Sequence, residues 1–366
     1  MMNIFSENPE KDLWRELLQF SYDANIERYL SKKGLSADVD TINCIVGSFL
    51  QAYEYYKSAK EANLQIAPLL LYYGSTNLLY GMINLLSGRI NNIDNHGMKI
   101  EVPSDMKFIS ETKIKFNSPD NGGVHVFSKA LGIDTKLTSY GEWALKEFLD
   151  SIAEINTDYI QCYGEKTGRI AMLDVFKTPD GKVEKVYFTD TNKDDLYELL
   201  KNVDGFSKSY LQPAVSKERE TGKQYFVLRH KLVGKSICEY SYSGQPYLKA
   251  PHCKHGKHIT LPTILNMYII LFALASLCRY FPERWSPFVL KDTTGEKMLI
   301  EKFIFYAGRM LPNYVLNILV ENTVQYSSDR YLENDTVKLV GEHQVNDMIE
   351  KSIERALEKR TYNNLH

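Results

Sequence analysis

The sequence PLLLYYGSTNLLYGMINLL at residues 68–86 has the length and apolar content of a helix that is buried on all sides. Pro68 stands where this helix begins, a position at which its missing N–H costs little, and Gly88 follows the last apolar residues. A second run of the same kind is ITLPTILNMYIILFALASLC at residues 259–278. Because neither run has a face for water, we expect the two helices to pack together in one core.

The second run is nearly long enough to cross a bilayer. Pro262 and Asn266 interrupt it, and Arg279 and Arg284 follow it directly, so we expect a core helix and no membrane span. The N-terminus has no apolar signal-peptide core, and the five cysteines include no CxxC pair. These features predict a cytoplasmic protein in a reducing compartment.

Helical periodicity extends outward from the two apolar runs. Residues 9–31 predict one helix, and a second helix runs from Ile42 to Tyr56 with Asp38 or Asp40 as its cap. Further helices are expected near the C-terminus, at residues 261–281, 295–322 and 343–360.

The middle of the chain has the pattern of strands. Short alternating runs extend from KIEVP at residue 99 to KVEKVYFTD at residue 182, and one of them is GGVHVF at residues 122–127. Turn signals stand at Pro119-Asp120-Asn121-Gly122 and Pro179-Asp180-Gly181, and the latter predicts the clearest hairpin. We also expect a strand pair at 223–233 and 236–243, and short helices at 143–155 and 192–203.

The predicted fold class is therefore α+β. A mostly helical bundle is expected from residues 1–97 and 259–366, with a β-rich insertion at residues 98–258.

Charge excludes a protein that is basic all over, because the net charge is -2. Residues 208–258 are nevertheless locally basic, with eight Lys and two Arg against three Glu. This segment predicts either a solvated surface or an anion-binding face. The sequence has no Walker A loop, GxGxxG, HExxH or GxSxG pattern, so no common enzyme class is favoured and no cofactor is expected.

The densest group of metal-ligand residue types is His252-Cys253-x-His255-x-x-His258. Adjacent residues rarely ligate one ion together, and no second ligand pair stands elsewhere in the sequence. We therefore expect a basic loop here and no metal, with His252, His255 and His258 as the residues that a metal would need.

A ligand site is predicted where the two apolar helices meet. Arg279, Arg284 and Trp285 follow the second helix, where they either terminate it or grip a phosphate and stack a base. Asn77 and Tyr73 lie in the first helix, and a buried Asn77 needs a hydrogen-bond partner. These five residues are the candidates for binding a nucleotide or nucleic acid.

Several motifs resemble the YaaC-like family. They are QAYEYY at residues 51–56, PLLLYYG at 68–74, His96-Gly97, and FALASL at 272–277 running into Arg279-Tyr280-x-Pro282. The likeness extends from about residue 10 to residue 320. It implies a sensor or interaction component of a bacterial anti-phage defence module, acting beside a partner effector protein. A homo-oligomer is also compatible with it.

The pair Tyr72-Tyr73, followed by His96-Gly97, is similar to HEPN-type helical domains, many of which are ribonucleases. In such enzymes an Arg that is separated from a His by four to six intervening residues stabilises phosphate charge while the His moves a proton. The matching pairs are Arg89 with His96 and Arg360 with His366. This resemblance implies a second function, a metal-independent ribonuclease using Arg89 and His96. A non-catalytic partner that stabilises another enzyme is a third, and we expect binding ahead of catalysis.

Overall fold

The computed structural model describes residues 2–117, 121–133, 136–164, 168–178, 181–187, 193–217, 219, 222, 224–229 and 237–327. The chain divides into two compact units, residues 17–315 and residues 1–16 together with 316–366. In the smaller unit, β1 (Met2–Phe5) pairs in parallel with β14 (Val324–Ser327), and α1 (Pro9–Leu17) follows β1 in the chain. The candidate site lies wholly in the larger unit.

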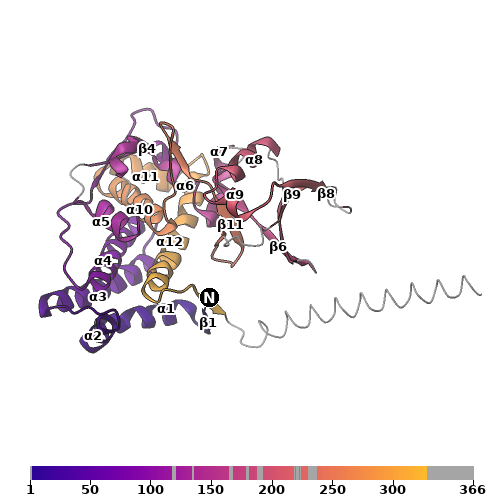
Figure 1. The fold of residues 1–366 in the computed structure, drawn as a ribbon. Helices are drawn as coiled ribbons and strands as arrows, with labels where there is room; N and C mark the ends of the chain where they lie inside the picture. Colours follow the sequence, from indigo (N-terminus) through magenta and orange to yellow (C-terminus); the bar gives the residue numbers. More distant parts are fainter. Residues whose placement is uncertain are drawn as a thin grey trace, which may run out of the picture. The chain divides into compact units, whose positions relative to one another are not determined.

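Long helices form the core of the larger unit. They are α2 (Asp23–Lys32), α3 (Val39–Glu61), α4 (Ala67–Ser87), α10 (Thr263–Tyr280), α11 (Pro282–Lys291) and α12 (Glu296–Leu319). α4 packs against α3 on one side and α10 on another (Figure 1). The predicted contact between the two apolar helices is confirmed.

α10 has the length and composition of a membrane-crossing helix, alone among the helices that the structure describes. However, every residue from Thr263 to Leu277 is buried within the protein. Its apolar surface is therefore covered by other parts of the chain, and the described residues give no indication of a span.

The ends of the N-terminal helices follow local chemistry. The single helix predicted over residues 9–31 is wrong, because α1 ends at Leu17 and α2 begins at Asp23. Between them lies a short 3₁₀ turn, in which the Ser21 hydroxyl donates to the Leu18 carbonyl at 2.6 Å. Asp38 caps α3 by accepting from the Thr41 N–H at 2.8 Å, as predicted.

Small, separate sheets confirm the α+β class. One sheet has the order β2 (Met98–Glu101), β3 (Lys113–Phe116), β4 (Glu142–Ala144), and a second has β6 (Asp174–Thr178), β7 (Gly181–Tyr187), β9 (Gln224–Arg229), β8 (Ala214–Lys217). The other two are β10 (Glu239–Tyr240), β11 (Pro246–Lys249), β5 (Ile170–Met172), and the hairpin β12 (His252–Lys254), β13 (Lys257–Ile259). All pairings in these four sheets are antiparallel.

Short helices lie between the strands. They are α5 (Gly123–Ala130), α6 (Leu145–Leu149), α7 (Asn156–Tyr163), α8 (Lys193–Lys201) and α9 (Phe206–Ser209). The strand predicted at residues 122–127 is therefore wrong, because α5 occupies that segment. Its first N–H groups, on Gly123 and Val124, donate to carbonyls of the preceding loop rather than to a strand.

The pairing of two other strands also differs from the prediction. β9 pairs with β7 and β8, and β10 pairs with β11, so the described residues of 223–233 and 236–243 do not pair with each other as expected. The hairpin of β6 and β7 is confirmed by the register of Thr178 with Gly181. Residues 118–120, 179–180, the predicted helix 343–360 and the pair Arg360 and His366 lie outside the described residues.

Candidate functional site

The loop that carries His96 is held by a close approach of two glycines. A Cβ atom on Gly122 would lie 2.2 Å from the Gly97 Cα, and Gly97 has a φ of 75°. This contact lets the carbonyls of Asn95 and His96 accept from the N–H groups of Gly123 (2.8 Å) and Val124 (3.2 Å) at the start of α5. The backbone at His96 is therefore fixed by the N-terminus of a helix.

The His96 ring lies against the core helices. Its Nδ1 is 2.7 Å from the Tyr72 hydroxyl, which is 3.2 Å from the Tyr268 hydroxyl. Its ring centroid is 5.7 Å from that of Phe272. Tyr72 and Tyr268 are buried, whereas His96 is exposed on its other side, and its Nε2 forms no hydrogen bond with any residue that the structure describes. One imidazole nitrogen is thus oriented and the other is left for a ligand.

Arg279 brings positive charge to this ring from the last turn of α10. It donates to the Tyr73 hydroxyl at 2.6 Å, and its guanidinium lies 4.9 Å from the ring centroid of Tyr280, which is 61% exposed. Tyr73 stacks on Tyr55 with ring centroids 5.9 Å apart. We call these five residues, Tyr55, Tyr73, His96, Arg279 and Tyr280, the His96 site.

Electrostatics keep the imidazole neutral. Burial against the aromatic rings lowers the pKa of His96, and the positive charge of Arg279 lowers it further. The ring is consequently uncharged at neutral pH and able to accept a proton, while Arg279 supplies the cation. An oriented neutral imidazole, a guanidinium and stacked tyrosines can bind a phosphate and an adjoining base.

The structure separates the other predicted residues from this group. Arg284 donates to the Ser104 carbonyl at 3.0 Å, and Trp285 is fully buried and donates to the Gln65 carbonyl at 3.1 Å. Asn77 is only half-buried, and its amide makes no hydrogen bond within the described part of the chain. The expected convergence therefore unites Tyr73, His96 and Arg279 but leaves out these three residues.

Arg89 does not complete the predicted ribonuclease pair in the described contacts. It is exposed just beyond the end of α4, and none of its described contacts joins it to His96. The cation that acts on His96 is Arg279 instead. No local spacing rule reveals this partner, because the two residues come from distant parts of the sequence.

The predicted metal-ligand residues lie on different sides of the β12–β13 hairpin. The His252 ring is buried, with its centroid 5.3 Å from that of Trp143, whereas Cys253, His255 and His258 are exposed. Strand alternation separates His252 from Cys253 and His258, whereas His255 lies in the turn between the strands. The residues that the structure describes contain no group of three metal-ligand side chains.

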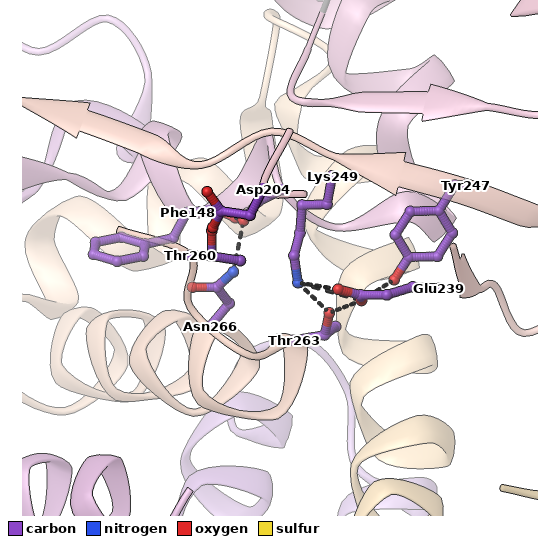
Figure 2. A network of polar contacts seen from close by, with 9 residues as sticks. Phe148, Asp204, Glu239, Tyr247, Lys249, Thr260, Thr263 and Asn266 are labelled. Atoms are coloured by element: carbon purple, nitrogen blue, oxygen red, sulfur yellow. Dashed lines mark hydrogen bonds and ion pairs between the residues drawn. The ribbon is translucent and has the colours of Figure 1, made fainter. Parts of the chain in front are cut away.

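Sequence reasoning missed a polar network at the other end of α10, which we call the Glu239 network. Its carboxylate accepts from Tyr247 (2.8 Å), Lys249 (3.0 Å) and Thr263 (3.0 Å), and Lys249 also donates to Thr263 at 2.9 Å (Figure 2). The Lys249 side chain is 3% exposed. A lysine that points inward from a strand was its only sequence signal.

Charge pairing governs the Glu239 carboxyl group. Burial opposes its ionisation, but the charge of Lys249 and the three hydrogen bonds outweigh burial and lower the pKa of Glu239 below its ordinary value. At Glu154, burial outweighs the opposing charge of Lys249 and raises the pKa of that carboxyl group. The network joins a buried lysine to a carboxylate whose side chain is 42% exposed, and it ties β10 and β11 to the start of α10.

Comparison with known proteins identifies one relationship. The YaaC-like Protein family matches residues 15–319, which include both the His96 site and the Glu239 network. No curated protein and no solved structure matches the chain.

Proposed function

The chain belongs to the YaaC-like protein family, and we propose that it is a cytoplasmic sensor that binds a nucleotide or single-stranded RNA at the His96 site. The resemblance described above supports a role in a bacterial anti-phage defence module, beside a partner effector protein. We also propose that α3, α4 and α10 belong to a HEPN-like core, and that residues 98–258 are a β-rich insertion in it.

One observation carries the binding proposal. Arg279 and His96 meet on a face of stacked tyrosines, and each keeps donors or a ring nitrogen that the described residues do not use. A guanidinium forms strong, charge-assisted hydrogen bonds with phosphate oxygens. Base stacking on an aromatic ring contributes roughly 1–3 kcal/mol per base, largely without regard to sequence.

Binding is testable by fluorescence anisotropy with a labelled single-stranded RNA. We expect Arg279→Ala to weaken binding at least about tenfold, since one lost charged hydrogen bond is worth roughly 1.5–3 kcal/mol. Arg89→Ala is the matched control, because Arg89 is exposed and stands apart from His96 in the described contacts. Equal losses in the two variants would reduce the effect to net charge and reject the site.

RNA cleavage is the second candidate function, favoured by the neutral imidazole beside a guanidinium. His96 would take the proton from a ribose 2′-hydroxyl, and the resulting oxygen would attack the adjacent phosphorus to form a 2′,3′-cyclic phosphate. The P–O5′ bond would break, the leaving 5′-oxygen would take a proton from water, and Arg279 would stabilise the negative charge of the phosphate. This assignment replaces Arg89 by Arg279 in the predicted pair.

One variant distinguishes RNA cleavage from RNA binding. His96→Ala is expected to abolish cleavage while RNA binding changes only a few-fold, because Arg279 and the tyrosines remain. A DNA strand of the same sequence lacks the 2′-hydroxyl and should bind without being cut. Cleavage of that DNA, or undiminished cleavage by His96→Ala, would rule the mechanism out.

A further inference from the structure

A cavity of about 620 Å³ opens beside the three-stranded sheet of β2, β3 and β4. Its polar lining comes from Asn95, Lys99, Lys115, Asn117, Thr138 and Glu142, and Phe116 contributes apolar surface. The volume is within the range of about 300–1,000 Å³ that is typical of small-molecule sites. Neither the cavity nor its charged residues take part in the His96 site.

One face of this sheet carries more lysines than carboxylates. Lys115 is 2.6 Å from Glu101 and 2.8 Å from Glu142, and Glu142 also pairs with Lys113 at 2.9 Å. These two carboxylates therefore form ion pairs with Lys113 and Lys115, two of the three lysines on this face. Lys99 has no carboxylate partner among the residues described, and the sheet register places it directly opposite Lys115.

A pair of like charges on opposite strands destabilises a sheet. The cost falls if an anion binds beside Lys99, since Lys99 would then have a counter-charge as Lys115 already has. Lys99 is exposed and its side chain is long, so its ammonium group can reach such an anion at the cavity. The sheet thus has a place for one further negative charge.

Uncharged donors complete the lining. The Asn95 side-chain oxygen accepts from the Gly97 N–H at 2.7 Å, which leaves its amide NH₂ group available. The side chains of Asn117 and Thr138 form no hydrogen bond within the described ranges. One unpaired ammonium, amide groups and a hydroxyl match the oxygens of a phosphate and a sugar.

The geometry points to a second ligand site, in which Lys99 binds the phosphate of a small phosphorylated molecule the size of a mononucleotide. Asn95 and Asn117 contact the same ligand, and Glu142 accepts from its hydroxyl or amino groups. The carbonyl of Gly97, which accepts from the Asn117 N–H at 2.8 Å, ties the cavity to the loop that fixes His96. The ligand therefore binds against the same backbone that positions the imidazole.

Isothermal titration calorimetry with three probes tests this site: AMP, ribose 5-phosphate and pyrophosphate. We expect saturable binding of at least one probe by the full chain, and at least about tenfold weaker binding by Lys99→Ala, in line with loss of a charged hydrogen bond. Lys113→Ala is the control, because it removes a lysine from the same sheet face outside the cavity lining, and should change affinity less than about twofold.

The Arg279→Ala variant separates this site from the His96 site. Binding that survives in Arg279→Ala and is lost in Lys99→Ala belongs to the cavity, whatever the fate of RNA binding. Binding that is lost in Arg279→Ala and kept in Lys99→Ala belongs to the His96 site and overturns the inference. It is equally overturned if none of the three probes binds at about 10 mM, or if Lys113→Ala weakens binding as much as Lys99→Ala.

Discussion

The two ends of α10 carry polar groups that are satisfied in opposite ways. At its start, Thr263 and Lys249 both bond to Glu239, and Lys249 also donates a hydrogen bond to Thr263. Near its end, Arg279 bonds to Tyr73 and His96 bonds to Tyr72, yet a ring nitrogen and guanidinium donors remain unused in the described structure. The closed network stabilises the fold, and the open one can bind a ligand.

The largest expected effect is on the closed end. Glu239→Ala leaves the Lys249 ammonium buried without its counter-ion, which should lower the free energy of unfolding by about 3 kcal/mol, the low end for a broken buried pair because the Glu239 side chain is itself 42% exposed. Urea denaturation measures this loss. Glu101→Ala, which breaks an exposed pair between β2 and β3, should cost much less. Similar costs for the two variants would mean that the Glu239 network is no better buried than a surface pair.

A moderate loss of stability is expected at Tyr72, the buried residue that holds His96 near the end of α10. Tyr72→Phe removes the hydroxyl that lies between His96 and Tyr268, and should destabilise the protein by about 1–2 kcal/mol. Thermal unfolding is measured for Tyr72→Phe and for Tyr73→Phe as the comparison, since among the residues described the hydroxyl of Tyr73 bonds only to an exposed arginine. A larger loss in Tyr73→Phe would reverse the assignment of supporting and ligand-facing tyrosines.

A smaller effect concerns the ionisation of His96. Arg279→Ala removes one of the two causes that lower the pKa of His96, so this pKa should move back toward its ordinary value of 6.5. An NMR titration of the imidazole protons measures the shift. No change, or a further decrease, would show that Arg279 does not act on the ring.

The pH dependence of stability has a definite sign. Since the pKa of His96 is lower in the folded state, the unfolded chain takes up this proton first as pH falls. The contribution of His96 to stability is present above pH 6.5 and declines below it. The decline should be shallower in Arg279→Ala, where the two pKa values lie closer together.

The smallest effect is expected at Asn77. This side chain is half-buried and makes no hydrogen bond in the part of the chain described, so Asn77→Ala should change the free energy of unfolding by less than about 0.5 kcal/mol. Urea denaturation would detect a cost above about 1 kcal/mol, which would restore the predicted role of Asn77 as a paired core amide.

Sequence reasoning succeeded where burial alone decides the structure. α4 and α10 are apolar on all sides, so their contact follows from local patterns, as do Pro68 in the first turn of α4 and Gly88 at its C-cap. It failed for α5, because that helix depends on carbonyls of Asn95 and His96 that reach its first N–H groups across a loop. Alternation along residues 122–127 gives no sign of that contact.

The same limit explains the site. The sequence predicts Arg279 as a ligand candidate because it follows an apolar helix, and Tyr73 because it lies in the helix expected beside it. Arg279 lies close enough to act on His96 because of the way α4 and α10 pack together, and no spacing in the sequence predicts that packing. Arg284 and Trp285 lie beside Arg279 in sequence, but α11 directs them to Ser104 and Gln65.

The most direct test of this account measures RNA affinity and unfolding free energy in parallel for Arg279→Ala and Glu239→Ala. Arg279→Ala should lose at least about tenfold in RNA affinity and less than about 0.5 kcal/mol in stability. Glu239→Ala, in conditions where it remains folded, should lose about 3 kcal/mol in stability and keep its RNA affinity within about twofold. Loss of both properties together in each variant would contradict the division of α10 into a stabilising end and a binding end.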